Sequence, residues 1–81
     1  MRYMVHFEFH HQPDAEFAAA VPAEYRRVAE LKQQGILEAI YLAADHSEGW
    51  IVMQGKGQEE VAVAVASLPL FKYMQVTYQA L

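Results

Sequence analysis

The order of strand-like and helix-like segments most constrains the fold of this chain. Between Arg2 and His10, aromatic and β-branched residues occupy every second position, and a period of two is typical of a strand. Ile36 to Ala43 and Trp50 to Gly55 predict two further strands, and the polar segment Asp45 to Gly49 between them suits a hairpin. Alternation returns between Tyr73 and Gln79, which predicts a fourth strand.

Two other segments favour helices. From Asp14 to Gln34 the chain is rich in Ala, Glu, Lys and Gln, and Gly35 is typical of a helix end. Pro22 lies inside this segment and predicts either a kink or a new helix start. The alternating Val and Ala of residues 61–66 would also suit a strand. The acidic pair before them favours a helix, because carboxylates stabilise a helix N-terminus, and Pro69 predicts its end.

These segments predict one α+β domain over residues 1–81, with the ferredoxin-like order β-α-β-β-α-β and a four-stranded antiparallel sheet. Two helices cover only one face of such a sheet, so the other face meets solvent or another sheet. We expect that second face to mix apolar and polar side chains: Met4, Ile40, Leu42, His6, Glu8 and His10. A mixed face favours a sheet-to-sheet homodimer enclosing a small cavity, a dimeric α/β barrel. A monomer with a partly apolar surface is the alternative.

Size and composition also favour self-association. The chain has 81 residues, 54% of them hydrophobic, and no Cys, so disulfides cannot supplement its small core. The net charge of −4 argues against nucleic-acid binding, which needs a positive surface. No apolar stretch approaches the roughly 18 residues of a membrane span. The N-terminus does not resemble a signal peptide either, so a cytoplasmic protein that does not bind membranes is expected.

Glu24 falls in the middle of the apolar sector of the first predicted helix, counted at about 100° per residue. The other members of this sector are Phe17, Val21, Val28 and Leu31. A buried ionised carboxylate is costly unless it is paired. Glu24 is therefore expected to have a partner, to be protonated through a raised pKa, or to open onto a pocket, and the last two options suit a general acid or base. The alternative is that Pro22 rotates it to the rim, where it pairs with Arg26 or Arg27.

A second polar group alternates along the first strand: His6, Glu8 and His10, with His11 next in sequence. Imidazole and carboxylate groups suit zinc or iron, but a metal site would need a further donor, for which His46 and Glu38 are candidates. A polar cavity wall or a solvated face is the favoured interpretation, so no metal or other cofactor is predicted. The first of these histidines could still carry protons.

His46 lies beside Asp45 in the predicted hairpin, where an Asp–His pair could orient the imidazole as a proton carrier. More often, such residues are ordinary polar groups of a hairpin. Aromatic residues at strand positions could line a pocket or belong to the core. The residues predicted to contact a substrate are Glu8, Tyr41, Trp50, Phe71 and Tyr73.

The segment Ser67-Leu68-Pro69-Leu70-Phe71-Lys72-Tyr73-Met74 resembles the Leu-Pro-Leu-Phe-x-Tyr-Met segment of the muconolactone isomerase family. The resemblance extends over the whole chain. It implies ferredoxin-like subunits paired sheet to sheet, which isomerise small lactones in aromatic catabolism without metal or organic cofactor. When both chains are registered on Gly35, the family's proton-moving glutamate corresponds to Glu24. The family hairpin resembles Gly-His-Tyr-x-Asn, whereas Ser47 and Gly49 stand here at the tyrosine and asparagine positions.

Two functions are therefore predicted. The first is a cofactor-independent, proton-transfer isomerase acting on a small cyclic or aromatic-derived compound, with Glu24, His6 and His46 as its catalytic residues. The second is a non-catalytic small-molecule-binding or assembly module of the same fold, which the altered hairpin favours. Product formation separates the two, because only an enzyme converts its ligand.

Overall fold

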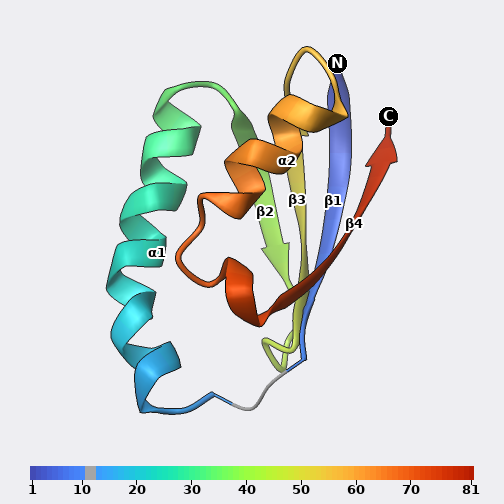
Figure 1. Ribbon diagram of the computed structural model, residues 1–81. Coiled ribbons are helices and arrows are strands. Elements are labelled where there is room, and N and C mark those ends of the chain that lie inside the picture. The colour runs from blue at the N-terminus through green and yellow to red at the C-terminus, as the bar shows by residue number, and fades with distance from the viewer. Residues whose placement is uncertain (11–12) are drawn as a thin grey trace.

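The computed structural model describes residues 1–10 and 13–81, so His11 lies outside the described residues. The elements follow in the predicted order (Figure 1): β1 (Arg2–Phe9), α1 (Ala15–Gln33), β2 (Leu37–Leu42), β3 (Glu48–Gln54), α2 (Gln58–Ala66) and β4 (Met74–Ala80). Neither α1 nor α2 is long and apolar enough to cross a membrane.

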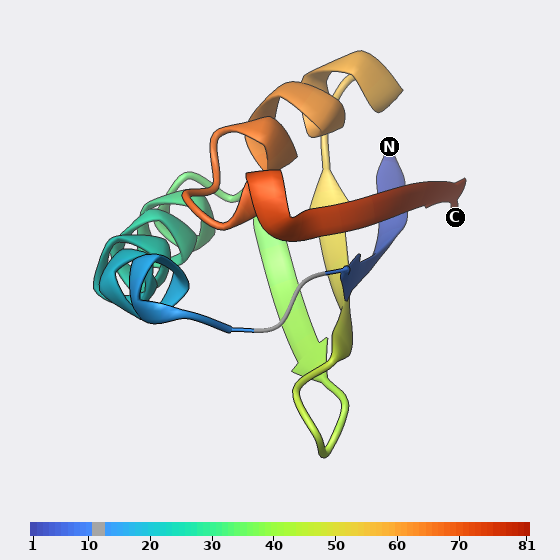
Figure 2. The same cartoon turned by 60° about the horizontal axis from the view of Figure 1, so that its bottom comes forward.

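The strands form one antiparallel sheet in the order β2-β3-β1-β4. Both helices pack on the same face of this sheet, and no helix or strand of the described residues covers the opposite face, which is called the open face below (Figure 1, Figure 2). The predicted α+β fold with the order β-α-β-β-α-β is confirmed. The alternating residues Tyr3, Val5 and Phe7 are buried against the helices, as a period of two requires.

Helix α1 runs through Pro22 without restarting. Its N-terminus is capped by Asp14, whose Oδ1 accepts a hydrogen bond from the backbone N–H of Phe17 at 2.9 Å. Because the helix is continuous, Glu24 keeps the angular position that the apolar sector predicts for it. Of the two alternatives predicted at Pro22, a kink or a new helix start, the continuous helix excludes the second.

The C-terminus of α1 ends in a Schellman motif centred on Gly35. This glycine has a φ of 77°, and its N–H donates to the carbonyl of Lys32 at 3.0 Å. The next N–H, of Ile36, reaches back to the carbonyl of Leu31 at 3.0 Å. The turn directs the chain into β2, and it places the buried Leu31 and Leu37 in the core on either side of it.

A register shift in β2 decides which of its side chains face the helices. The shift lies between Leu37 and Ala39, and after it Ile40 is paired with the core residue Ile51. One extra residue in a strand moves all later side chains to the other face. Ile40 and Leu42 therefore face the helices, and the prediction that they lie on the second face is wrong.

The chain between α2 and β4 contains an element that the sequence did not indicate. Residues Phe71–Tyr73 form a short 3-10 turn, and β4 begins at Met74. Tyr73 is thus buried before the strand rather than opening it, and its ring lies 5.1 Å from that of Phe17 on α1. The turn anchors the end of α2 against the first half of α1.

Candidate functional site

A cavity of about 620 Å³ lies between α1, the helix-facing side of the sheet and the β2–β3 hairpin. It is lined by Phe7, Phe9, Pro13, Phe17, Val21, Glu24, Tyr25, Val28, Lys32, Ile40, Leu42, Asp45, His46, Ser47, Leu70 and Met74. Mostly apolar walls with a few polar groups are typical of small-molecule sites. Aromatic residues from β1 and α1 form much of the wall, so a flat, partly apolar ligand would fit its chemistry.

Glu24 is the half-buried carboxylate of this cavity. It shares the cavity with Phe17, Val21 and Val28, the neighbours on the helix that the sequence places beside it. Burial raises the pKa of Glu24 above its usual value, because an ionised carboxylate is poorly solvated there. A hydrogen bond from the backbone N–H of Leu70, at 3.0 Å, opposes this rise in pKa without cancelling it.

Of the two arginines proposed as alternative partners of Glu24, Arg27 makes other contacts. Arg27 donates to Oγ of Ser67 at 2.9 Å and pairs with Glu30 at 3.2 Å. The hydrogen bond described for Glu24 comes instead from an uncharged amide. An amide holds one carboxylate oxygen in place but compensates its charge less than a guanidinium would, which is why the pKa stays raised.

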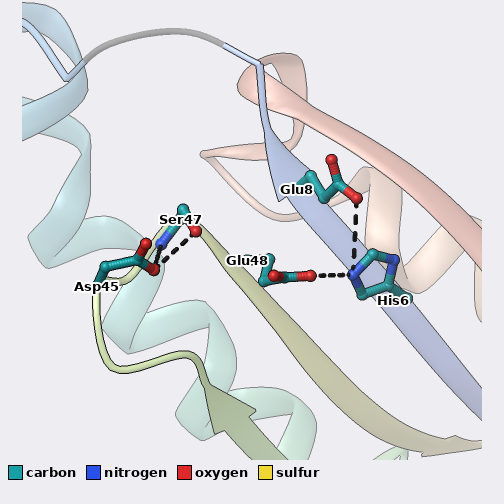
Figure 3. Close-up of polar contacts among 5 residues, drawn as sticks. All are labelled: His6, Glu8, Asp45, Ser47 and Glu48. Atoms are coloured by element: carbon teal, nitrogen blue, oxygen red, sulfur yellow. Dashed lines mark hydrogen bonds and ion pairs between the residues drawn. The ribbon is translucent and has the colours of Figure 1, made fainter.

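His46 also lines the cavity, at the tip of the β2–β3 hairpin. It has a φ of 63°, a left-handed conformation that is uncommon for a residue other than Gly. The adjoining Asp45 accepts two hydrogen bonds through Oδ1, from the N–H of Ser47 at 3.0 Å and from its Oγ at 2.7 Å (Figure 3). These bonds lower the pKa of Asp45 and fix the turn, so this carboxylate acts mainly on the hairpin rather than on the imidazole.

His6 lies on the open face of the sheet, opposite to the cavity. Its Nε2 is 2.8 Å from Oε1 of Glu48 and 3.9 Å from Oε1 of Glu8 (Figure 3). Its ring centroid is 5.5 Å from that of Trp50. His6 therefore does not share the cavity of Glu24 within one chain, although the sequence analysis grouped the two as catalytic residues. Glu48, its nearest partner, was not predicted.

The residues predicted to contact a substrate lie outside this cavity. Glu8, Tyr41 and Trp50 point to the open face, whereas Phe71 and Tyr73 belong to the turn before β4. The cavity is instead lined by residues that were not predicted as site residues: Phe9, Tyr25, Lys32, Ile40 and Leu42. The helical positions, Tyr25 and Lys32, could have been predicted from the helical period of the apolar sector that contains Glu24. The strand positions depend on the register shift in β2.

Gly49, near the start of β3, has no room for a side chain. A Cβ at this position would lie 2.5 Å from Cζ of Phe7 and 2.8 Å from the carbonyl oxygen of Tyr41. The phenyl ring thus occupies the space that a side chain would need. An asparagine at this position would have to displace the aromatic floor of the cavity.

The family is decided by a match over the whole chain. A family model, described as muconolactone delta-isomerase, matches residues 1–81. The chain belongs to the muconolactone delta-isomerase family. The resemblance inferred from the residues around Pro69 is confirmed. No curated protein sequence matches this member of the family significantly.

Solved structures support the fold of this muconolactone delta-isomerase family member. A muconolactone isomerase structure has 21% identity and a TM-score of 0.85, covering 100% of this chain and 88% of that one. A 5-chloro-2-hydroxyhydroquinone dehydrochlorinase from Burkholderia phenoliruptrix, in complex with 2,5-dihydroxybenzoquinone, has 14% identity and a TM-score of 0.75. It covers 100% of this chain and 93% of that one. At these identities the likeness shows the fold alone.

Proposed function

We propose that this chain is a cofactor-independent isomerase that moves a proton within a small cyclic or aromatic-derived compound. One observation carries this proposal: Glu24 is a half-buried carboxylate with a raised pKa in a largely apolar cavity. A carboxylate that is poorly stabilised as an anion is a stronger base than one in water. The muconolactone isomerase and the dehydrochlorinase share its fold and are named for acting on compounds of this kind.

In this proposal Glu24 takes a proton from a carbon next to a carbonyl group of the substrate. It returns the same proton to another carbon of the molecule, so a double bond moves and no other reactant is consumed. The N–H of Leu70 holds Oε1, which leaves the second oxygen for the substrate. Water is poorly accommodated by the aromatic wall, which favours return of the proton to the substrate over its loss to solvent.

His46 is proposed as the second polar group of the reaction. It shares the cavity with Glu24 and reaches it from the opposite wall, because the hairpin and α1 flank the site. A ring N–H at that position would donate to the oxygen of the substrate on which negative charge develops. His6 would contribute only if a second subunit brought its open face to this cavity.

The test is turnover of muconolactone by the natural chain and by the Glu24→Gln variant. Glutamine keeps an oxygen that accepts from Leu70 but cannot take a proton. We expect turnover, and exchange of substrate protons with deuterated water, to fall at least roughly a hundredfold, the usual contribution of a general base. Full activity in Glu24→Gln would remove Glu24 from the mechanism.

The matched control is Glu30→Gln, the same substitution on the same helix. Glu30 is exposed and pairs with Arg27 rather than lining the cavity. We expect it to keep the activity of the natural chain. Equal losses in both variants would point to a general effect on α1, and circular dichroism of both proteins would reveal it.

A non-catalytic binding module is the second candidate, because Ser47 and Gly49 stand where the family pattern has tyrosine and asparagine. Such a module would keep the cavity and bind a ligand there, but it would not convert that ligand into a product. A ligand such as 2,5-dihydroxybenzoquinone, bound by the dehydrochlorinase relative, would raise the melting temperature without being converted. Stabilisation by muconolactone together with zero product would favour this candidate.

Self-association through the open face is part of the proposal. That face exposes 60% of Tyr41 and carries the half-buried residues Met4 and Trp50 beside the buried Val52. These side chains lie on neighbouring strands and form an apolar strip that one subunit does not cover. A second copy placed sheet to sheet would bury the strip and enclose the polar residues between the two sheets.

A further inference from the structure

The open face of the sheet holds a group of ligating atoms that the proposed reaction does not use. Nε2 of His6 and one carboxylate oxygen each of Glu8 and Glu48 all lie within 4.8 Å of one another. His6 and Glu8 are two residues apart on β1, and Glu48 of β3 is paired directly with Glu8 (Figure 3). The three side chains converge because Glu48 also lies diagonally across from His6.

The two carboxylates face each other without a described lysine or arginine between them. Like charges at directly opposed strand positions destabilise a sheet. Both oxygens are turned toward the same ring nitrogen of His6, at 2.8 Å from Glu48 and 3.9 Å from Glu8. The third carboxylate of this face, that of Glu38, has a cationic partner instead: Arg2 donates hydrogen bonds to both of its oxygens at 3.0 and 3.1 Å.

We propose that His6, Glu8 and Glu48 form a binding site for a divalent transition-metal ion of the zinc type. Zinc accepts imidazole nitrogen and carboxylate oxygen at about 2.0–2.2 Å, and sites with three protein ligands leave a position for water or another ligand. Ligand atoms that all lie within 4.8 Å of one another need only small rotamer changes to surround an ion at that radius. Both strands are in the middle of the sheet, which supports the side chains rigidly.

This site differs from the metal site that was considered, but not favoured, on the basis of the sequence alone. That interpretation joined His6 and Glu8 to His10, with His46 or Glu38 as a further donor. His10 follows the end of β1, and His46 lines the cavity on the other side of the sheet. Pairing of β1 with β3 supplies Glu48 instead.

The metal site is independent of the reaction proposed for Glu24. The ligands project from the open face, whereas Glu24 lies between the other face and α1. Loss of the metal site would leave the base in place, and loss of the base would leave the ligands in place. The two proposals can therefore fail separately.

The test is a titration of the full chain, without an affinity tag, with zinc sulfate. Trp50 is the only tryptophan, and its ring lies beside that of His6, so its fluorescence reports on this site. We expect a saturable change in fluorescence with one zinc ion per chain, the same stoichiometry by calorimetry, and a higher melting temperature. Absence of stoichiometric binding would overturn the proposal.

Variants of four residues locate the bound ion. His6→Ala and Glu48→Gln each remove one ligand and are expected to weaken zinc binding at least about tenfold, because loss of even a hydrogen-bonding partner of a metal ligand typically costs that much. Glu38→Gln is the matched control, an acidic residue on the same face, and is expected to bind zinc like the natural chain. Unchanged binding in His6→Ala and Glu48→Gln, or loss of binding only in His10→Ala, would contradict the assignment.

Discussion

The backbone N–H of Leu70 donates a hydrogen bond to Oε1 of Glu24 across a sequence separation of 46 residues. This bond joins the middle of α1 to the turn that precedes β4. Leu70 itself is buried, so the donor is held firmly by the core. The carboxylate is thereby fixed at the cavity wall by a partner that carries no charge, which keeps Glu24 both oriented and basic.

The first prediction concerns the stability of Glu24→Gln as a function of pH. Because the pKa of Glu24 is raised in the folded state, the folded chain binds this proton more tightly than the unfolded chain. The contribution of Glu24 to the free energy of unfolding is complete at pH values below its pKa in the unfolded chain. This contribution is lost as pH rises through the pKa of Glu24 in the folded chain. Urea unfolding at successive pH values should therefore show that the free energy of unfolding of Glu24→Gln increases relative to that of the natural chain as pH rises.

Glu24→Leu separates the charge of this residue from its hydrogen bond. Leucine removes the acceptor, so the N–H of Leu70 is left unsatisfied at a cost of about 1–3 kcal/mol. We expect Glu24→Leu to be less stable than Glu24→Gln at every pH. Parallel pH profiles for Glu24→Gln and the natural chain would contradict the raised pKa.

The placement of Glu24 could be predicted from the sequence, whereas the partners of His6 could not. A helical period of 3.6 residues is a local property, so the sector shared by Glu24, Phe17 and Val28 was visible in the sequence. The register between β1 and β3 depends on the whole sheet. It is this register that brings Glu48 next to His6.

The register shift in β2 set a second limit on prediction. Alternation alone places Ile40 and Leu42 on the face opposite to that of Leu37. The extra residue at position 38 reverses this placement, so both side chains face the helices. The 3-10 turn at Phe71–Tyr73 was hidden for a related reason. The turn itself alternates apolar and polar residues, with Lys72 between two aromatic residues, so its period resembles that of a strand and does not reveal where β4 begins.

The second prediction is that Gly49→Ala destabilises the fold. The new methyl group would meet the ring of Phe7 at about the 2.5 Å found for an ideal Cβ, so the ring or the strand must move. Such overpacking typically costs about 1–3 kcal/mol in the free energy of unfolding. Gly57→Ala is the matched control, because nothing lies within 4 Å of an ideal Cβ at Gly57. Gly57 is the N-cap of α2, so the free energy of unfolding should fall by less than about 1 kcal/mol.

A double variant tests the cause of this loss. Phe7→Leu shortens the side chain that faces Gly49, so Gly49→Ala should cost less in that background. Chemical denaturation of the two single variants and the double variant gives the coupling free energy. Strictly additive losses would mean that Phe7 is not what Gly49 accommodates.

The third prediction concerns self-association through the open face. Tyr41→Glu places a charge on the proposed interface, next to Trp50, and should shift the chain toward monomer in sedimentation velocity. Val63→Glu is the control, because Val63 is 72% exposed on α2, on the helix-covered side. Its assembly should match that of the natural chain. Dissociation by Val63→Glu alone would place the interface on the helices.

The fourth prediction separates the role of His46 in the turn from its role in the cavity. His46 adopts a φ of 63°, a conformation that costs a residue with a Cβ about 1–2 kcal/mol and costs Gly nothing. His46→Gly should therefore leave the free energy of unfolding unchanged or raise it by up to about 1 kcal/mol, after allowing for the entropy of the unfolded glycine. Turnover should nevertheless fall, because the donor to the substrate oxygen is gone. A variant that is stable and inactive would show that the strain is retained for the imidazole, whereas a stable and fully active variant would assign His46 to the hairpin alone.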